Sequence, residues 1–504
     1  MDGTTFADRL QQVMAEKNLK QADLIHIAAE LGEKLGKSQV SQYVSGKVVP
    51  RANVVRLLSS ILDVEEAWLA SGDGGRASAR PETAPTTPSD IATTKRSSTM
   101  REFKKSNKLD NVLYDVRGPV ADEAARMEDE GTRILKLNIG NPAPFGFRTP
   151  DEVVYDMRQQ LPDCEGYSDS RGLFSARKAI MQYAQLKHLP NVTMDGIYTG
   201  NGVSELIQLC MNALLDIGDE ILIPSPDYPL WTACATLAGG TPVHYLCDEQ
   251  AEWTPDLADM ESKVTSNTKA IVIINPNNPT GAVYPREVLE QIVEIARRHQ
   301  LMIFSDEIYD RLCMDGYEHI SIASLAPDLP CVTFSGLSKS HMVAGYRIGW
   351  MILSGNKRCM QDFIYGINML SNMRLCSNVP AQSIVQTALG GYQSVERYVE
   401  PGGRVYEQRN YVYEALNAID GITAVKPKAA FYIFPKIDVK KFNITDDEQF
   451  ALDLLHEKHI LITRGGGFNW PEPDHFRIVY LPRMGVLREA MTDLAYFFAH
   501  YRQA

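Results

Sequence analysis

The sequence predicts an α/β protein, with a mostly parallel sheet covered by helices on both faces, a small α+β domain after it and an all-helical module before it. Three observations predict this fold class. Short apolar runs alternate with amphipathic stretches through the middle of the chain, as is typical of parallel sheets. Longer helical patterns with few strands follow from about Tyr392. A stretch rich in Pro, Ser and Thr separates both parts from an N-terminal region that shows no strand pattern.

Size and composition narrow the class of protein. A chain of 504 residues suggests about three domains. Its 44% hydrophobic and 23% charged residues are typical of soluble globular proteins, and no apolar run is long enough for a membrane helix. No secretory signal is visible, and the eight cysteines occur singly. We therefore expect a cytoplasmic protein without a metal site. The net charge of −12 argues against the whole chain coating nucleic acid.

The N-terminal region, residues 1–71, is expected to be a compact helical unit. Phe6, Leu10 and Met14 recur at four-residue spacing, which indicates a helix, and further helical stretches follow up to residue 64. Residues 72–105 then contain almost no large apolar side chains. Such a stretch cannot bury enough surface to offset its ordering entropy, so it is predicted to be a flexible linker.

The remaining chain is expected to form an N-terminal arm and large domain over residues 106–391 and a small domain over residues 392–504. The expected strands of the large domain lie within residues 197–202, 220–226, 269–279, 301–309, 331–339 and 349–354. Helical patterns occupy residues 204–216 and 286–299, and the expected strands of the small domain lie within residues 431–435, 460–465 and 476–481. Ligands of such sheets bind at the carboxyl ends of the strands.

Distinctive motifs stand at those strand ends. Lys339 follows a strand and a short Ser/Gly turn, with Arg347 eight residues later; on position alone, a solvated surface lysine is the more common reading. The turn NPNNPTGAVY, residues 275–284, can present the amide of Asn278 to a ligand. Asp306 and Tyr309 belong to SDEIYD after another strand, where an isolated acid is equally typical of a helix cap.

Glycine-rich turns add to the pattern. TGNGVSELI, residues 199–207, offers backbone N–H groups and a helix N-terminus to a phosphate, although Ser204 as a simple helix cap is the alternative. Gly140 lies in LNIGNPAP, and Tyr228 lies in PSPDYPLW between a strand and a helix.

Taken in this order, the motifs resemble those of fold-type I aminotransferases of class I, from about Asn107 to the C-terminus. Among these, the chain is most similar to bacterial alanine (glutamate–pyruvate) aminotransferases. The segments that carry this likeness are NKLDNVLYDVRGPV, NIGNPAPFGF, PDYPLW, INPNNPTGAVY, NVPAQ and FNWPEPDHFRIVYLPR. The resemblance implies a large domain with a mostly parallel seven-stranded sheet, a small α+β domain and pyridoxal 5′-phosphate as the cofactor.

The resemblance also implies roles around the cofactor ring. Lys339 would form the Schiff base with the cofactor aldehyde and then move the proton between Cα and C4′. Asp306 would pair with the pyridine nitrogen and keep it protonated. Asn278 and Tyr309 would donate hydrogen bonds to the phenolic oxygen, and Tyr228 would stack on the ring.

For the cofactor phosphate, the resemblance implies Arg347, the backbone of Val203 and Ser204, and the Ser204 hydroxyl. Many relatives have a serine three residues before the lysine, whereas this chain has Gly336. Ser335 and Ser338 flank that glycine, which leaves open the serine that contacts the phosphate. In YSDSRGL, Tyr167 would reach the phosphate of the neighbouring subunit, which implies a homodimer.

Substrate recognition is expected to use Arg477, which the family keeps for the α-carboxylate, together with Asn278 and the Gly140 backbone. Without the other motifs, Arg477 would be interpreted as a surface arginine on a strand. Tyr114 and Arg117 resemble the segment that closes over bound substrate. We expect them to bias the site toward small side chains and 2-oxoglutarate.

The N-terminal unit resembles the helix-turn-helix of Cro/repressor-type regulators. The second helix would span about Gln21 to Leu31 and the recognition helix about Ser38 to Tyr43. Residues suited to base edges are Gln39, Ser41 and Gln42, and residues suited to phosphates are Lys37, Lys47 and Arg51. The turn is longer than usual and the unit is not basic overall, so a helical docking module without a DNA role is the alternative.

The expected reaction is reversible amino transfer from L-alanine to 2-oxoglutarate, which gives pyruvate and L-glutamate. Two alternatives remain: an aminotransferase for other small or branched amino acids, and a regulator that senses pyridoxal phosphate or an amino acid and binds DNA through residues 21–51. The presence of the catalytic set favours an enzyme over a pure sensor.

Overall fold

The computed structural model describes residues 5–30, 35–72, 103–110, 112, 114 and 118–504. The chain divides into two compact units, Met1–Glu102 and Phe103–Ala504, each of which is described by itself. Apart from its two ends, the predicted linker 72–105 lies outside the described residues. Within the described ranges, no helix has the length and apolar character needed to cross a bilayer.

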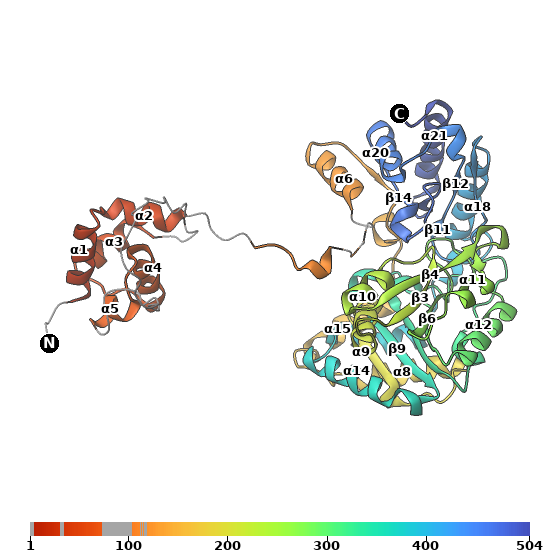
Figure 1. The fold of residues 1–504 in the computed structure, drawn as a ribbon, viewed down its shortest axis with the longest axis horizontal. Helices are drawn as coiled ribbons and strands as arrows, with labels where there is room; N and C mark the ends of the chain where they lie inside the picture. Colours follow the sequence, from red (N-terminus) through yellow and green to blue (C-terminus); the bar gives the residue numbers. More distant parts are fainter. Residues whose placement is uncertain (1–4, 31–34, 73–102, 111, 113, 115–117) are drawn as a thin grey trace, which may run out of the picture. The chain divides into compact units, whose positions relative to one another are not determined.

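The described part of the N-terminal unit is entirely helical (Figure 1). Its helices are α1 (Phe6–Glu16), α2 (Gln21–Glu30), α3 (Lys37–Val44), α4 (Ala52–Leu62) and α5 (Glu66–Ser71). A capping box of Thr5 and Asp8 begins α1, and Leu10, Leu24 and Leu62 are completely buried in one core. The predicted helices are present, and α5 is an addition, because six residues are too few to show a periodic pattern.

The larger unit is built on an eight-stranded sheet with the order β2–β9–β8–β7–β6–β3–β4–β5. Its strands are β2 (Ile197–Gly200), β3 (Glu220–Ser225), β4 (Thr241–Asp248), β5 (Thr254–Pro255), β6 (Thr268–Ile274), β7 (Met302–Asp306), β8 (Pro330–Gly336) and β9 (Gly349–Gly355). Neighbours from β8 to β4 are parallel, whereas β9 is antiparallel to both of its neighbours and β5 is antiparallel to β4. The predicted α/β class is confirmed, and the strand beyond the expected seven is the two-residue β5.

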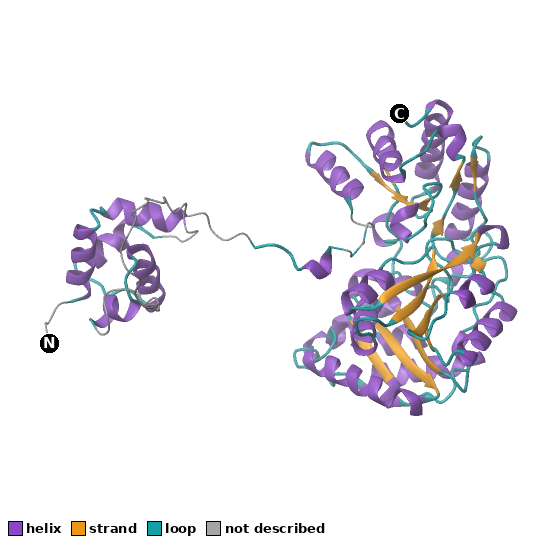
Figure 2. Cartoon of the chain, viewed as in Figure 1, coloured by secondary structure: helices purple, strands orange, loops and turns teal. Residues whose placement is uncertain are grey.

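Helices cover both faces of this sheet (Figure 2). On one face lie α8 (Phe174–Leu186), α12 (Arg286–Arg298) and α16 (Val385–Gly390), and on the other lie α9 (Val203–Leu214), α10 (Leu230–Ala238) and α14 (Gln361–Met373). Successive residues of β6 alternate between the two cores, with Ile271 and Ile273 in one and Val272 and Ile274 in the other. This two-sided burial explains why the strands are continuous apolar runs.

The C-terminal part is a smaller α+β domain. Its longer helices are α18 (Arg404–Asn417), α20 (Asp447–Lys458) and α21 (Met484–His500). An antiparallel sheet has the order β11 (Tyr432–Ile433), β15 (Phe476–Val479) and β14 (Thr463–Arg464), and β10 (Ile422–Thr423) pairs with β12 (Lys436–Ile437). Shorter helices of the whole unit are α7 (Asp151–Gln160), α11 (Leu257–Ser262), α13 (Leu337–Ser340), α15 (Val379–Ser383), α17 (Glu396–Val399) and α19 (Val439–Phe442).

One segment groups differently from the predicted division at residue 391. Helix α6 (Pro119–Asp129) packs on α20, and β1 (Leu135–Lys136) pairs in parallel with β13 (Ile460–Leu461). Their apolar side chains belong to the core of the C-terminal part. The sequence pattern assigned this segment to the arm and large domain, because periodicity shows that a helix has a buried face but not which core it joins.

Candidate active site

A cavity of about 620 Å³ lies where strands β2, β3, β6, β7 and β8 end. Most of the predicted site residues line it: Tyr114, Gly140, Val203, Ser204, Tyr228, Asn278, Asp306, Tyr309, Ser338, Lys339, Arg347 and Arg477. The residues that follow β2, β3, β6, β7 and β8 are far apart in the sequence, and the common carboxyl edge of these parallel strands brings them together. Tyr114 and Gly140 come from the segment before the sheet, and Arg477 comes from the C-terminal part. The cavity has the size of an ordinary small-molecule site.

Lys339 lies in α13, directly after β8. Its Nζ donates a hydrogen bond to the carbonyl oxygen of Gly140 at 2.6 Å, so the amine already faces the cavity. At Gly336, an added Cβ would lie 2.8 Å from the carbonyl oxygen of Ile348. A serine there would have to displace strand β9, which explains why this chain departs from the usual motif.

The two serines beside Gly336 differ in position. Ser338 lines the cavity, whereas Ser335 is buried within β8 and is not among the residues that line it. Of these two serines, Ser338 is therefore the one that is available to a ligand in this cavity.

Asp306, the last residue of β7, is buried with only 3% of its surface exposed. Its carboxylate accepts hydrogen bonds from Trp231 Nε1 and from the backbone N–H of Ile308, both at 3.3 Å. Burial raises the pKa of Asp306 to about 6, and among the described residues no cationic side chain pairs with it. A buried carboxylate without a counter-charge is costly and suits a cationic group of a ligand.

Arg477 comes from β15 and is also 3% exposed. Its Nη1 donates to Oδ1 of Asn278 at 2.8 Å, and its Nη2 donates to the carbonyl oxygen of Asn138. The Nε atom is buried without a hydrogen-bond partner in the described chain. The guanidinium also lies 4.4 Å from the ring centre of Tyr432 and 4.5 Å from that of Phe468. A fixed guanidinium with an unused donor is suited to a carboxylate.

An anion site is formed by the first turn of α9 and Arg347. The guanidinium of Arg347 is fixed by hydrogen bonds to the carbonyl oxygens of Ala344 and Asn201, both at 3.0 Å. Gly202 precedes the helix with φ 83°, and a Cβ there would collide with this guanidinium. Glycine is therefore required for the positive charge to approach the helix N-terminus, where backbone N–H groups also attract anions.

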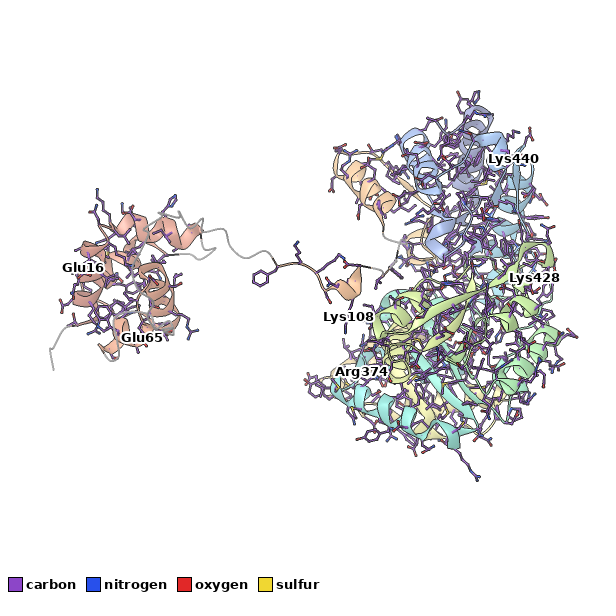
Figure 3. The ribbon with its side chains drawn as sticks, in the orientation of Figure 1. Glu16, Glu65, Lys108, Arg374, Lys428 and Lys440 are labelled. Carbon is purple, nitrogen blue, oxygen red and sulfur yellow. The ribbon has the colours of Figure 1, made fainter. Side chains whose placement is uncertain are left out.

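Arg374, labelled in Figure 3, stabilises the same turn from the end of α14. It donates to the carbonyl oxygen of Thr199 at 2.7 Å and pairs with Glu205 in the first turn of α9. The backbone N–H of Asn201 donates to Glu205 at 2.7 Å. The glycine-rich turn is thus held from both sides.

Three other residues predicted for the site differ in their relation to the cavity. The hydroxyl of Tyr114 lies 3.1 Å from that of Tyr228, so the arm meets the turn after β3. Tyr167 is 82% exposed and does not line the cavity. Arg117 lies outside the described residues.

The sequence motifs did not identify Tyr432, which lines the cavity from β11. Its hydroxyl lies 2.7 Å from that of Tyr309. The segment FYIFP showed only a strand pattern, and no turn or charged residue marked it. Trp231, the donor to Asp306, ends the segment PSPDYPLW, in which the sequence pattern points only to Tyr228.

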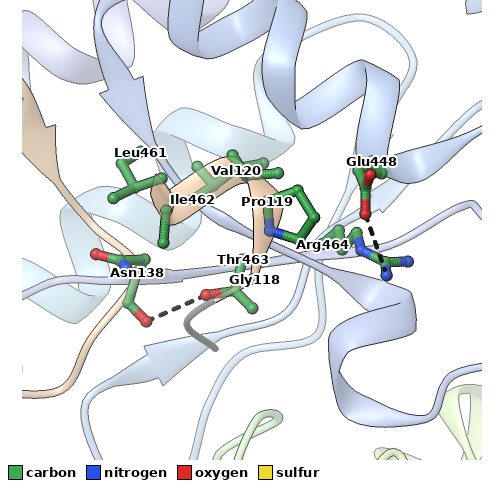
Figure 4. A pocket seen from close by; sticks show the side chains of 10 residues that line it. Gly118, Pro119, Val120, Asn138, Glu448, Leu461, Ile462, Thr463 and Arg464 are labelled. Carbon is green, nitrogen blue, oxygen red and sulfur yellow. Dashed lines mark hydrogen bonds and ion pairs between the residues drawn. The ribbon is translucent and has the colours of Figure 1, made fainter. Parts of the chain in front are cut away.

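A second, much smaller cavity lies between the Gly118–Ala121 segment and the strands β13 and β14 (Figure 4). Thr463, on its wall, donates to the carbonyl oxygen of Asn138 at 3.2 Å. Its volume of about 10 Å³ is close to the least that one water molecule needs. The larger cavity is therefore the candidate site.

Comparisons with known proteins agree with this geometry. The family model described as "Aminotransferase class I and II" matches residues 132–493. Glutamate-pyruvate aminotransferase AlaA of Haemophilus influenzae is 60% identical over 404 residues, which are 80% of this chain and 100% of that protein. Alanine aminotransferase of Mycobacterium tuberculosis is 57% identical over 404 residues, which are 80% of this chain and 94% of that protein.

A solved structure is also similar. The crystal structure of an aminotransferase from Escherichia coli has a TM-score of 0.79 and 57% identity, and the match covers 80% of this chain and 100% of that one.

Proposed function

The chain belongs to the aminotransferase class I and II family, and on that premise we propose that it transfers the amino group of L-alanine to 2-oxoglutarate, giving pyruvate and L-glutamate. The fold-type I architecture expected from the motifs is confirmed. The substrate proposal is supported by relatives that are named for glutamate–pyruvate or alanine transamination and are 57–60% identical.

Enzymes of this family use pyridoxal 5′-phosphate, which when bound supplies an electron sink for the bonds at an amino acid's Cα. The cavity residues fit this cofactor. Asp306, buried without a counter-charge, suits the ring cation, and an ion pair at ~4 Å is worth ~4 kcal/mol at an effective dielectric of ~20. The first turn of α9, Arg347 and Ser338 would hold the phosphate. Asn278 and Tyr309 would donate to the phenolic oxygen, and Tyr228 would cover the ring.

Lys339 is the proposed base. Its Nζ would bind the cofactor's aldehyde carbon at rest and, once released by the amino acid, take the proton from the substrate Cα. The hydrogen bond to the Gly140 carbonyl keeps this amine on the substrate side of the cavity.

The observation that carries the proposal is the buried guanidinium of Arg477, which lines the same cavity as Lys339 and has no carboxylate partner among the described residues. A substrate α-carboxylate would give this buried cation its counter-charge, as buried charges require. Asn278, bonded to the same guanidinium, and the backbone of Gly140 would complete the carboxylate site. Tyr114 lines the cavity beside them, and we propose that Arg117 acts with it in closing over small substrates.

The test is a panel of amino donors with 2-oxoglutarate, in which glutamate formation by the purified holoenzyme is followed. We expect kcat/KM for alanine to exceed that for valine, leucine, aspartate and phenylalanine by at least ~10-fold. Lys339→Ala should abolish turnover with every donor. A preference for aspartate or aromatic donors would overturn the alanine assignment, and a preference for valine or leucine would favour the alternative of branched donors. Failure to transaminate any donor would leave the sensory regulator as the better hypothesis.

We also propose that the enzyme is a homodimer. Tyr155, Tyr167 and Phe174 are strongly exposed, as are Tyr365 and Met373 on α14. The hydrogen bond between Ser170 and Asn372 places these two groups on neighbouring segments. So much exposed apolar surface suits an interface, and an exposed Tyr167 is free to reach the phosphate site of a second copy.

A second candidate function is DNA binding through residues 21–51, which we propose for the N-terminal unit. The observation in its favour is the division of α3: Val40 and Tyr43 are buried, whereas Gln39, Ser41 and Gln42 are exposed. The exposed side chains are of the types that read base edges. Lys37, Lys47 and Arg51 are also exposed nearby and suit phosphates.

A gel-shift assay with the DNA upstream of the protein's own gene tests this second proposal. Gln42→Ala should weaken specific binding by ~1–3 kcal/mol, and Lys47→Ala should weaken binding to all sequences. The control is Gln12→Ala, an exposed glutamine on α1. Binding that is absent, or unaffected by all three substitutions, would favour a docking module instead.

A further inference from the structure

A hydrogen-bonded pair joins the turn after β3 to the C-terminal part of the chain. Its members are Asp227, in the segment PSPDYPLW, and Asn469, in the segment FNWPEPDHFRIVYLPR. Asn469 Nδ2 donates to Oδ1 of Asp227 at 2.7 Å, although the two residues are 242 positions apart in the chain. Neither residue lines the cavity, and the cofactor and substrate roles proposed above use neither.

Two further hydrogen bonds join the same two segments. The backbone N–H of Asp227 donates to the carbonyl oxygen of Phe468 at 3.0 Å, and Ser225 Oγ donates to the carbonyl oxygen of Asn469 at 2.8 Å. Phe468 ends the 3-10 helix η10 (Gly465–Phe468), and Asn469 follows it with φ 55°. The turn after β3 therefore holds two consecutive residues of the C-terminal part in place.

The side chain of Asp227 is fully buried. Its carboxylate also accepts a hydrogen bond from Thr232 Oγ1 at 2.8 Å, and no cationic side chain among the described residues pairs with it. Burial raises the pKa of Asp227 to about 7. A buried carboxylate without a counter-charge is costly for the fold, and ionisable groups with shifted pKa values gather at functional sites. Asp227 is therefore a candidate for a role in the neighbouring cavity.

The pair connects two residues that line the cavity. On one side, Asp227 directly precedes Tyr228, which lines the cavity and would cover the cofactor ring. On the other side, the ring centre of Phe468 lies 4.5 Å from the Arg477 guanidinium. Phe468 is fully buried, so a shift of its ring would displace the side chains packed on it. The bonds between the two segments thus link the position of Arg477 to that of Tyr228.

We propose that Asp227 is a positioning residue for the substrate carboxylate. Through its bonds to residues 468–469, it holds the Arg477 guanidinium at the distance from Tyr228 that a substrate bound to both the cofactor and the guanidinium requires. The inference rests on the proposed function and deepens it, because it names a residue outside the cavity that supports carboxylate binding. A shift of about 1 Å at a binding group can cost ~100-fold in rate, so losing the pair should impair reactions that need the carboxylate and spare those that do not.

The test compares two reagents that react with the cofactor of the purified holoenzyme and change its absorbance. Aminooxyacetate carries a carboxylate, and methoxyamine does not. The ratio of their rate constants therefore measures carboxylate recognition, whereas a loss of folded protein would lower both rates equally. We expect Asp227→Leu to lower this ratio at least ~10-fold through the aminooxyacetate rate. With L-alanine and 2-oxoglutarate, both KM values should rise ~10-fold while kcat changes less than ~threefold.

Asp227→Asn is the conservative variant. Its amide oxygen can accept from Asn469 and its amide N–H can donate to Thr232 Oγ1, so the ratio should stay within about threefold of wild type. Asn469→Gly removes the pair from its other side, and glycine readily adopts the positive φ of this position. It should lower the ratio about as much as Asp227→Leu, and the double variant should lower it little further. Should Asp227→Leu fail to fold, Asn469→Gly decides the test.

His244→Leu is the matched control. His244 Nε2 lies 2.9 Å from Thr232 Oγ1 at the far end of the same polar network, so this variant keeps the pair and should keep the wild-type ratio. An unchanged ratio in Asp227→Leu, or an equal fall in His244→Leu, would overturn the positioning role. Arg477→Lys should lower the ratio by itself, and an unchanged ratio in that variant would instead overturn the carboxylate site of the proposed function, so the two failures are distinct.

Discussion

At the scale of single residues, the buried carboxylate of Asp306 makes the stability of the cofactor-free protein depend on pH. Its pKa is raised by burial to about 6, whereas an unfolded aspartate titrates near ~3.9. The folded state therefore favours the protonated form. Stability from this residue is full below pH ~4 and is lost as the pH rises to ~6, with a total of about 3 kcal/mol.

Asp306→Asn removes that ionisation, so we predict that the cofactor-free variant is more stable than wild type at pH 8 by roughly 1–3 kcal/mol. The gain should be smaller at pH 5. Urea unfolding at both pH values measures it. The control is Asp362→Asn, at an exposed position in the first turn of α14, which should show no such gain. A cofactor-free Asp306→Asn protein that is less stable at pH 8 would contradict the assignment. The same substitution should reduce transaminase activity, because the ring cation loses its partner.

Single residues also show how far the site could be predicted from the sequence. Lys339, Asp306 and Asn278 stand at strand ends within distinctive motifs, and the cavity gathers them. Tyr432 could not be predicted, because its place depends on the pairing of two short strands. Gly336 looked like a missing phosphate ligand, and only the closeness of β9 shows why a side chain does not fit there.

At the scale of elements, a buried polar network joins the end of α8 to the segment after β7. Lys187 Nζ lies 2.5 Å from Oδ2 of Asp310, 3.8 Å from Oε2 of Glu307 and 3.0 Å from Nδ1 of His319. Burial opposes the charge of Lys187, but the Asp310 carboxylate outweighs it and raises the pKa of the lysine. This network anchors the four residues that follow Asp306.

We predict that Lys187→Met lowers the free energy of unfolding by about 3–5 kcal/mol, because it removes the cation that contacts two buried carboxylates. Lys178→Met, at an exposed lysine on α8, should change it by less than ~0.5 kcal/mol. Urea denaturation of the two variants measures the difference. Equal stabilities would show that the network contributes no net stability. No periodic pattern could have predicted this cluster, because its members are polar and come from three separate segments.

The elements that could be predicted from the sequence are those with a strong apolar pattern. The strands of the large domain are apolar on both faces, so their runs stand out in the sequence. Two-residue strands such as β1 and β11 carry no such signal. The membership of α6 in the C-terminal domain depends on a partner helix, α20, more than 300 residues later in the chain.

At the scale of the whole molecule, the proposed dimer can be tested by the mass of the protein in solution. Met373 is 74% exposed at the end of α14, and Met373→Glu would place a charge in the proposed interface, where an unpaired buried charge is costly. We expect light scattering to show a dimer for wild type and a larger monomer fraction for the variant. Leu186→Glu, at an exposed apolar residue at the other end of α8, should keep the dimer mass. A wild-type monomer with full activity would contradict the shared site.

Because β1 pairs with β13, the catalytic unit can complete its fold only late in biosynthesis. Thr463 donates a hydrogen bond to the carbonyl oxygen of Asn138, although the two residues are 325 positions apart in the chain. Leu137 lies in the same core as residues of α21. On the ribosome, the start of the catalytic unit must wait unpaired until almost the whole chain has been translated, and such distant contacts slow folding. The described N-terminal helices α1 to α5 pack on one another and can fold long before. A nascent chain would therefore carry a folded N-terminal helical unit while the catalytic unit is still unfolded.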